Sequence, residues 1–333
     1  LTALPAVSGH EAQPAEAVAE LFRPYCDTVE VDKNGNMLGF RSCGRKNAKT
    51  VLLDAHLDQI GFLVTEVLDG GFLRFAPVGG VDPRVVIGRP VRFGNVQGVI
   101  GIKAVHLTTA AERRTMPKTK DLYIDIGAAS KAAAEDKVSL GDYGVFDSAV
   151  VEFGDGLIKA KAIDDRVGCA TLLKLIEDEP PIDTWFCFTV QEEVGLRGAA
   201  SMAYALDPGF AMVLEGTTAA DLAEVEGGKA VCRVRGGVVL PFMDGATIYD
   251  AELFELLRNA CDKRGIRWQT KTRVAGGTDA GRIHKSRAGV RVCAAAAPVR
   301  YIHSPSSVAA VADCEAVLSA ARAFLEELGG DDE

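Results

Sequence analysis

Apolar and polar positions follow two patterns along this 333-residue chain. Short apolar runs are typical of strands buried on both faces of a sheet, and they cover residues 50–53, 185–190, 210–214 and 290–299. Apolar residues recur at helical spacing over residues 166–177, 251–264 and 307–328. This alternation of strands and helices predicts an α/β fold.

The start of the chain predicts a helix followed by a hairpin. The helical pattern covers about residues 10–22, and Ser8 is a candidate cap for that helix. Asn34-Gly35 lies between two extended segments and is a pair favoured in type I′ hairpin turns.

Residues 65–159 differ from the rest of the chain. Valine and glycine dominate, glycine-containing turns recur, and helical periodicity is found only near residues 130–137. This composition predicts a small β-rich domain inserted into the α/β domain. The α/β domain then comprises residues 1–64 plus 160–333, and both domains have ordinary sizes.

Composition and charge narrow the functional class. The chain is 48% hydrophobic and 25% charged, as globular proteins are. Its formal net charge of −9 repels nucleic-acid phosphates, so nucleic acid is not an expected partner. No apolar run reaches the ~18 residues of a membrane-spanning helix. The eight scattered cysteines, without a Cys-x-x-Cys pair, indicate reduced thiols in a cytoplasmic protein.

Acidic and imidazole side chains follow the ends of the predicted strands or precede the helix at 166. Ligands of open α/β sheets bind outside the carboxyl ends of the strands, so we expect these side chains to converge there. They are His56, Asp58, Asp164, Asp165, Glu192, Glu193, Glu215 and His303.

Each of these residues alone has an ordinary structural interpretation. Asp164-Asp165 suits a helix cap, and Glu192-Glu193 suits a solvated pair. Together, however, acids that converge at one sheet edge would repel one another and lose hydration unless cations compensated their charge. Imidazole and carboxylate ligands without thiolate favour zinc, cobalt or manganese. Asp58 lies two residues after His56 and can therefore accept the second ring N–H of that histidine.

Six segments carry a further signal: 55–62 (AHLDQIGF), 162–168 (AIDDRVG), 189–199 (TVQEEVGLRGA), 214–218 (LEGTT), 276–280 (GGTDA) and 301–305 (YIHSP). They resemble the M42 metallo-aminopeptidases in both residues and order. That family includes the tetrahedral TET peptidases and members labelled endoglucanase M. The resemblance runs over nearly the whole chain.

The resemblance implies a phosphorylase/hydrolase-like α/β catalytic domain with an inserted small β-barrel domain. It also implies two divalent metal ions per chain, with zinc or cobalt expected first and manganese as a third option. Asp164 would bridge the two metals. His56 and Glu215 would complete one site, and Glu193 and His303 the other. A strained, cis peptide bond would precede Asp165.

The implied activity is the removal of N-terminal residues from short peptides. A water held between the metals would attack the peptide bond, with Glu192 as general base and Asp58 as the partner of His56. The resemblance also implies a dimer-based homo-oligomer, with the tetrahedral dodecamer as one form, and the inserted domain would serve assembly or substrate access. Gln59 stands where many members have Glu, and Glu215 where many have Asp. The roles of Gln59, Arg197 and Asp279 stay open.

Two other functions also stay open at this point. A glycoside hydrolase would use Glu192 and a second acid ~5 to 9.5 Å away and would need no metal. The two histidines in ligand-like positions argue against it. A non-catalytic metal-binding assembly protein is the other alternative, and the presence of the base together with all five ligands argues against that one.

Overall fold

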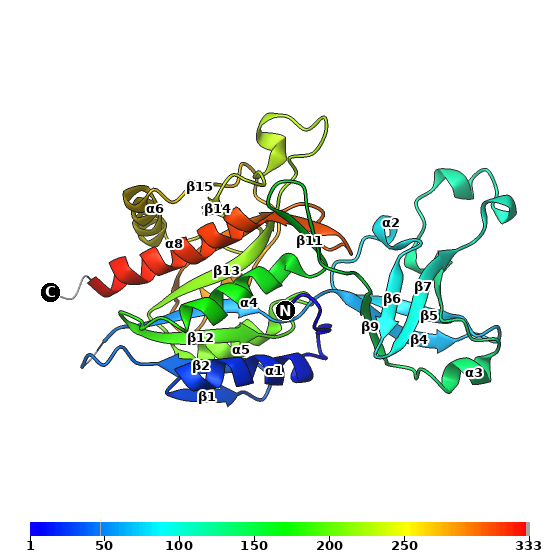
Figure 1. The fold of residues 1–333 in the computed structure, drawn as a ribbon, viewed down its shortest axis with the longest axis horizontal. Helices are drawn as coiled ribbons and strands as arrows, with labels where there is room; N and C mark the ends of the chain where they lie inside the picture. Colours follow the sequence, from blue (N-terminus) through cyan, green and yellow to red (C-terminus); the bar gives the residue numbers. More distant parts are fainter. Residues whose placement is uncertain (47, 331–333) are drawn as a thin grey trace.

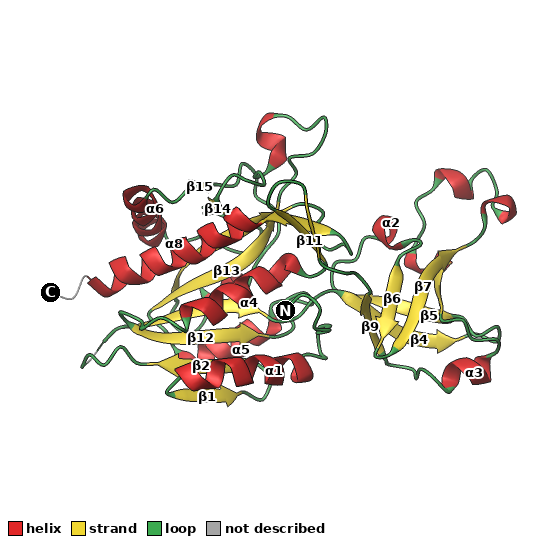
Figure 2. Cartoon of the chain, viewed as in Figure 1, coloured by secondary structure: helices red, strands yellow, loops and turns green. Residues whose placement is uncertain are grey.

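The computed structural model describes residues 1–46 and 48–330. A layered α/β part and a closed β-barrel lie side by side in the molecule (Figure 1). Helices surround the sheet of the α/β part, whereas strands form the barrel and only short helices flank it (Figure 2). This arrangement confirms the expected fold class, an α/β domain with an inserted small β-barrel.

An eight-stranded mixed sheet forms the centre of the α/β part. Its strands are β1 (Thr28–Val31), β2 (Met37–Arg41), β3 (Thr50–His56), β12 (Asp183–Thr189), β13 (Phe210–Thr218), β14 (Val238–Val239), β15 (Trp268–Gln269) and β16 (Arg291–Val299). Their order is β1-β2-β12-β3-β13-β16-β14-β15. The four predicted apolar runs form β3, β12, β13 and β16, which are parallel neighbours.

Helices cover both faces of this sheet. They are α1 (Ala12–Phe22), α4 (Ile163–Leu175), α5 (Arg197–Leu206), α6 (Ala251–Arg264), α7 (Ala280–Ile283) and α8 (Val311–Gly330). Helices α1, α4, α6 and α8 share an apolar core with Leu53 of β3, whereas α5 and α7 share one with Leu52. Adjacent residues of a strand point to opposite faces, so β3 is buried on both sides.

The barrel strands follow the order β4-β5-β8-β7-β6-β9 and close on themselves. Phe62 packs edge-on against Phe75 and Phe146 inside the barrel, with ring centroids 5.4 and 5.0 Å apart. The barrel elements are β4 (Gly61–Val67), β5 (Leu73–Val78), α2 (Pro83–Val86), β6 (Pro90–Phe93), β7 (Val96–Ile102), β8 (Leu122–Asp125), α3 (Lys131–Glu135) and β9 (Tyr143–Phe146).

A small sheet corrects the predicted helix over residues 307–328. The first four of these residues form strand β17 (Ser307–Ala310), and α8 begins only at Val311. β17 pairs with β11 (Leu157–Ala160), which also pairs with β10 (Val151–Phe153). The backbone groups of Ser307–Ala310 are therefore satisfied by a distant strand, a partner that helical periodicity cannot reveal.

Two features of the N-terminal region also differ from expectation. Ser8 does not cap α1, because its hydroxyl donates to Asp58 Oδ2 at 2.5 Å. The hairpin between β1 and β2 is present, but its loop covers residues 32–36 and is thus longer than a two-residue turn. No helix within residues 1–46 and 48–330 is long and apolar enough to cross a membrane.

Candidate metal centre

The carboxyl ends of the parallel strands bring the acidic and imidazole residues to one edge of the sheet. His56 ends β3 and lies opposite Thr189, the last residue of β12. Glu215 belongs to β13, which pairs with β3 on its other side. Asp164 lies near the start of α4, which packs against both β3 and β13.

His56 lies at the centre of one group of ligand atoms. Its Nε2 is 3.2 Å from Asp164 Oδ1 and 3.3 Å from Glu215 Oε1. Glu192 Oε2 is 3.9 Å from the same nitrogen. On the other side of the ring, Nδ1 is 3.1 Å from the main-chain oxygen of Asp58 and 3.4 Å from its Oδ1. Asp58 therefore leaves Nε2 free to face the acids.

Asp164 connects this group to a second one. Its Oδ2 lies 3.4 Å from His303 Nε2, while its Oδ1 faces His56. Glu193 Oε2 is 3.3 Å from the same nitrogen of His303. The two oxygens of one carboxylate thus face two separate imidazoles, as a carboxylate that bridges two cations must.

The residue after Asp164 is also close to the centre. The peptide bond between Asp164 and Asp165 is cis, as the resemblance implied. Ligand atoms within 4.8 Å of one another form the groups His56–Asp165–Glu215 and Asp164–Glu193–His303. Asp165, however, already accepts hydrogen bonds from the main-chain N–H of His56 at 3.2 Å and of Gly168 at 2.9 Å. The oxygens of Asp164, in contrast, face the imidazoles of His56 and His303.

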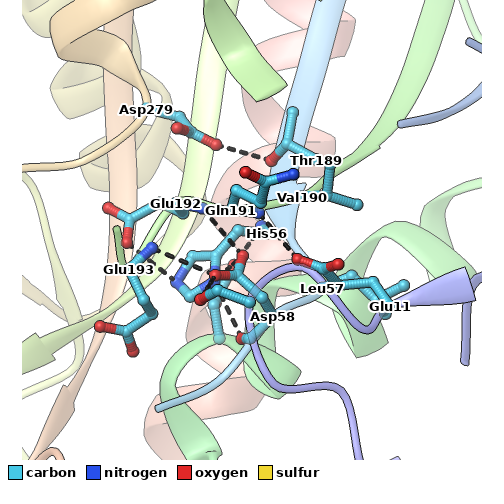
Figure 3. Close-up of polar contacts among 12 residues, drawn as sticks. Glu11, His56, Leu57, Asp58, Thr189, Val190, Gln191, Glu192, Glu193 and Asp279 are labelled. Carbon is cyan, nitrogen blue, oxygen red and sulfur yellow. Dashed lines mark hydrogen bonds and ion pairs between the residues drawn. The ribbon is translucent and has the colours of Figure 1, made fainter. Parts of the chain in front are cut away.

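The chain changes direction after β12 so that both glutamates reach the centre. Gln191 has a left-handed backbone with φ of 57°. Asp58 then accepts hydrogen bonds from the main-chain N–H of Glu192 at 2.9 Å and of Glu193 at 3.2 Å, as Figure 3 shows. Glu11 accepts another from the main-chain N–H of Gln191 at 3.0 Å. This local departure from a regular strand lets two adjacent residues point into the same site.

Burial and mutual repulsion shift the titration of the acids. Burial raises the pKa of Glu192 and of Glu215 well above the usual range, and Glu215 adds to the rise at Glu192. Burial and the charge of Asp164 raise the pKa of Glu193 to about 7. The pKa of His56 lies well above its ordinary value, because the carboxylates of Glu215 and Glu192 outweigh the opposing effect of burial.

These observations test whether the residues fit a pair of divalent cations. Buried carboxylates this close together hold protons unless positive charge compensates them. Two acid–imidazole groups that share Asp164 offer the oxygen and nitrogen donors that zinc or cobalt accepts. The donor set therefore fits two divalent ions, one at each group.

A cavity of about 250 Å³ opens onto this centre. The acids and imidazoles of the centre that line it are His56, Asp164, Glu192, Glu193, Glu215 and His303. Neutral residues and one lysine form the rest of the wall, namely Gly216, Thr217, Thr218, Lys271, Ala275, Gly276, Gly277, Thr278 and Ile302.

Three residues whose roles the sequence left open, Gln59, Arg197 and Asp279, do not line this cavity. Gln59 accepts a hydrogen bond from Lys161 Nζ at 3.0 Å. Arg197 is exposed, and its Nη1 lies 3.5 Å from Gln191 Oε1. Asp279 makes no side-chain cap for α7 and instead accepts a hydrogen bond from Thr189 Oγ1 at 2.6 Å.

Sequence reasoning missed three residues that support or line the site. Ser8 and Glu11 bind Asp58 and Gln191, and Lys271 lies on the cavity wall. No local motif indicates these roles, because only the fold brings the three residues to the site.

Comparison with known proteins shows which family the chain resembles, independently of the geometry of the site. The family model of the M42 glutamyl aminopeptidases matches residues 35–319. An aminopeptidase from the archaeon Desulfurococcus kamchatkensis is 35% identical, with a TM-score of 0.93 over 98% of this chain and 92% of that one. The TET1 peptidase of Pyrococcus horikoshii, which assembles into a tetrahedron or an octahedral shell, is 30% identical, with a TM-score of 0.84 over 97% of this chain and 96% of that one.

A curated relative with a named activity extends the comparison. The lysyl aminopeptidase of Pyrococcus furiosus is 29% identical over 97% of this chain and 94% of its own. The matched family segment covers most of the chain and contains the complete set of acids and imidazoles described above. The chain belongs to the M42 glutamyl aminopeptidase family of metallopeptidases and is an aminopeptidase that removes N-terminal residues from peptides.

Proposed function

We propose that this aminopeptidase works with two divalent metal ions and with Glu192 as general base. His56, Asp164 and Glu215 would hold one ion, and Asp164, Glu193 and His303 the other. The observation that carries the proposal is the position of Asp164, whose two oxygens lie 3.2 Å and 3.4 Å from the Nε2 atoms of His56 and His303.

Bound ions would supply the positive charge that polarises the scissile carbonyl and makes an attacking water acidic. Glu192 lines the cavity without belonging to either of the two ligand groups. Burial raises its pKa, so this carboxylate is suited to take a proton from water and to return it to the departing amine. Such proton transfer contributes ~10²- to 10⁴-fold in rate.

Asp58 acts as a positioning residue in this proposal. Its carboxylate holds the main-chain N–H groups of Glu192 and Glu193, and its main-chain oxygen accepts from His56 Nδ1. One buried residue thus orients Glu192 and Glu193 through its carboxylate and His56 through its main-chain oxygen. Its own place is secured by the hydroxyl of Ser8.

The barrel is proposed to serve assembly or access of substrate, with residues 65–159 as the inserted domain and residues 1–64 plus 160–333 as the catalytic domain. The Pyrococcus horikoshii relative assembles into closed shells, and this supports a homo-oligomer, of which the tetrahedral dodecamer is one form. Short peptides are the proposed substrates. Eight free thiols, five of them buried, support a cytoplasmic location.

The variant Glu192→Gln tests the mechanism. It should keep two ions per chain in elemental analysis, since Glu192 belongs to neither ligand group, and lose hydrolysis of aminoacyl-p-nitroanilides by at least ~10²-fold. Glu20→Gln, at an exposed position of α1, serves as control and should keep full activity. Unchanged turnover in Glu192→Gln would refute the assignment of the base.

A further inference from the structure

Lys271 is the one basic side chain, apart from the two imidazoles, among the residues that line the cavity of the metal centre. The next three residues, Thr272 to Val274, are exposed, whereas Lys271 is half-buried. Its side chain therefore lies against the cavity wall while the chain around it faces solvent.

The segment that carries Lys271 is held in place from both sides. Gln269 donates from Nε2 to the main-chain oxygens of Arg233 at 2.7 Å and Gly237 at 3.2 Å. Thr272 donates from its main-chain nitrogen to the oxygen of Val231 at 2.9 Å. The position of Lys271 is thus defined by hydrogen bonds of its neighbours.

Among the residues that the structure describes, the ammonium group of Lys271 has no ion-pair partner. Its hydrogen bond runs from Nζ to the main-chain oxygen of Ala275 at 3.4 Å, a long contact. Asp244 is the acid that acts most strongly on it, yet within residues 1–46 and 48–330 no carboxylate oxygen lies within the 4.0 Å of an ion pair. Burial lowers the pKa of Lys271 below its ordinary value.

Asp244 is already committed to other groups. Its carboxylate accepts hydrogen bonds from Tyr249 Oη at 2.6 Å and from the main-chain N–H groups of Ala246 and Thr247 at 2.7 Å each. Structural pairing with Asp244 therefore does not explain why a lysine is half-buried here. A partly desolvated cation without a counter-charge is suited to bind an anionic ligand, which supplies the negative charge.

We propose that Lys271 binds a carboxylate group of the peptide substrate and so determines which peptides the enzyme prefers. The inference rests on the proposed function of the adjoining centre, because the substrate must reach that centre through the same cavity. When the acids of the centre hold cations, Lys271 and Glu192 are the charged groups left on the wall. The carboxylate has two sources, the side chain of an acidic N-terminal residue or the C-terminus of a dipeptide.

Two pairs of substrates separate these sources. Glutamyl- and glutaminyl-p-nitroanilide differ only in a side-chain carboxylate, and leucyl-glycine and its amide differ only in a C-terminal one. The wild type should prefer the carboxylate member of one pair, and Lys271→Met should reduce that preference about 10- to 100-fold, mainly through KM, as the loss of a charge-assisted hydrogen bond implies. The pair that responds identifies the source.

Control variants distinguish the loss of the Lys271 charge from a general loss of activity. Lys271→Arg keeps the charge and should restore most of the preference, whereas Lys229→Met, at an exposed lysine, should keep both activity and preference. Calorimetric binding of the free products, glutamate against glutamine, gives a second measurement for the side-chain source, and it does not depend on turnover.

The proposal is overturned if the wild type shows no preference in either pair. It is also overturned if Lys271→Met keeps the preference, or slows both members of each pair equally. Failure of the proposed mechanism would show elsewhere, as a Glu192→Gln variant that still cleaves leucyl-p-nitroanilide. The preference for the carboxylate member of a pair is compared between Lys271→Met and the wild type. Both proteins have the same base, so the comparison does not depend on which residue that base is.

Discussion

His303 Nδ1 donates a hydrogen bond to the main-chain oxygen of Gly80, with 3.1 Å between the two atoms. Gly80 follows β5 of the barrel, so a residue next to the barrel contacts an imidazole of the candidate metal centre. Because a carbonyl oxygen can only accept, Nδ1 carries the proton of this bond, and Nε2 faces Asp164 and Glu193. The barrel therefore contributes directly to the geometry of the site.

We expect Gly80→Ala to weaken metal binding at the His303 group. A Cβ atom at Gly80 would lie 2.9 Å from His303 Nδ1, so the ring would have to move. Loss of such an orienting contact costs ~10- to 100-fold in metal affinity or activity. Titration with zinc or cobalt measures this. Gly209→Ala is the control, because its Cβ would lie 3.8 Å from the nearest atom, and equal affinities in the two variants would argue against the role of Gly80.

Asp58→Asn should lower kcat/KM by ~10- to 100-fold. Both carboxylate oxygens of Asp58 accept hydrogen bonds, from Ser8, Glu192 and Glu193. The amide of asparagine has one acceptor oxygen, so at least one of these hydrogen bonds is lost. The loop that carries Glu192, the proposed base, then loses a fixed position. Steady-state kinetics measure the effect, with Asp69→Asn at an exposed position as control. A variant with wild-type kinetics would show that the Asp58 carboxylate does not position Glu192.

His56→Ala and His303→Ala should each lower the metal content below two ions per chain. Each histidine faces a different oxygen of Asp164, so removal of one imidazole takes a ligand from one group and leaves the other group complete. Elemental analysis of the purified variants gives the count. The exposed His106 provides the control variant, His106→Ala, which should match the wild type. A full complement of metal in either test variant would exclude that histidine as a ligand.

Metal removal should abolish hydrolysis and lower thermal stability together. Ions that bind only the folded centre stabilise it by ~2.7 kcal/mol at a hundredfold excess over Kd. Treatment with phenanthroline or EDTA, followed by zinc or cobalt, should therefore remove and restore both activity and several degrees of Tm. Activity that persists at full rate in metal-free protein would contradict a metal-dependent mechanism.

The sequence predicted those parts of the fold and site that have local signatures. The apolar runs of β3, β12 and β13 predicted buried strands, and the polar residues at their ends predicted the centre, because parallel strands end at one edge. Residues with distant partners were not predicted. Ser8 has the signature of a helix cap, yet its hydroxyl binds Asp58, fifty positions away. Lys271 was missed because only the fold brings it to a cavity lined by residues such as His56 and Glu215, far away in the chain.

Stability should rise with pH between about 7 and 8.5 because of Lys161. This lysine is 3% exposed, and its Nζ donates to the main-chain oxygen of Thr2 at 2.6 Å and to Gln59 Oε1 at 3.0 Å, both uncharged acceptors. Burial, aided by the charge of Arg166, lowers the pKa of Lys161 to about 7. The unfolded chain keeps the proton up to its ordinary pKa near 10.5, so it binds more protons than the folded chain in this window.

The free energy of unfolding should therefore increase by about 1 to 2 kcal/mol over this window from this group alone. Urea unfolding at several pH values, compared between wild type and Lys161→Met, isolates the contribution. The difference between the two proteins should change with pH, whereas Lys137→Met, at an exposed lysine, should run parallel to the wild type. If the Lys161→Met curve is parallel to that of the wild type, the buried amine keeps its proton on folding, and the neutral acceptors Thr2 and Gln59 hold a charged lysine.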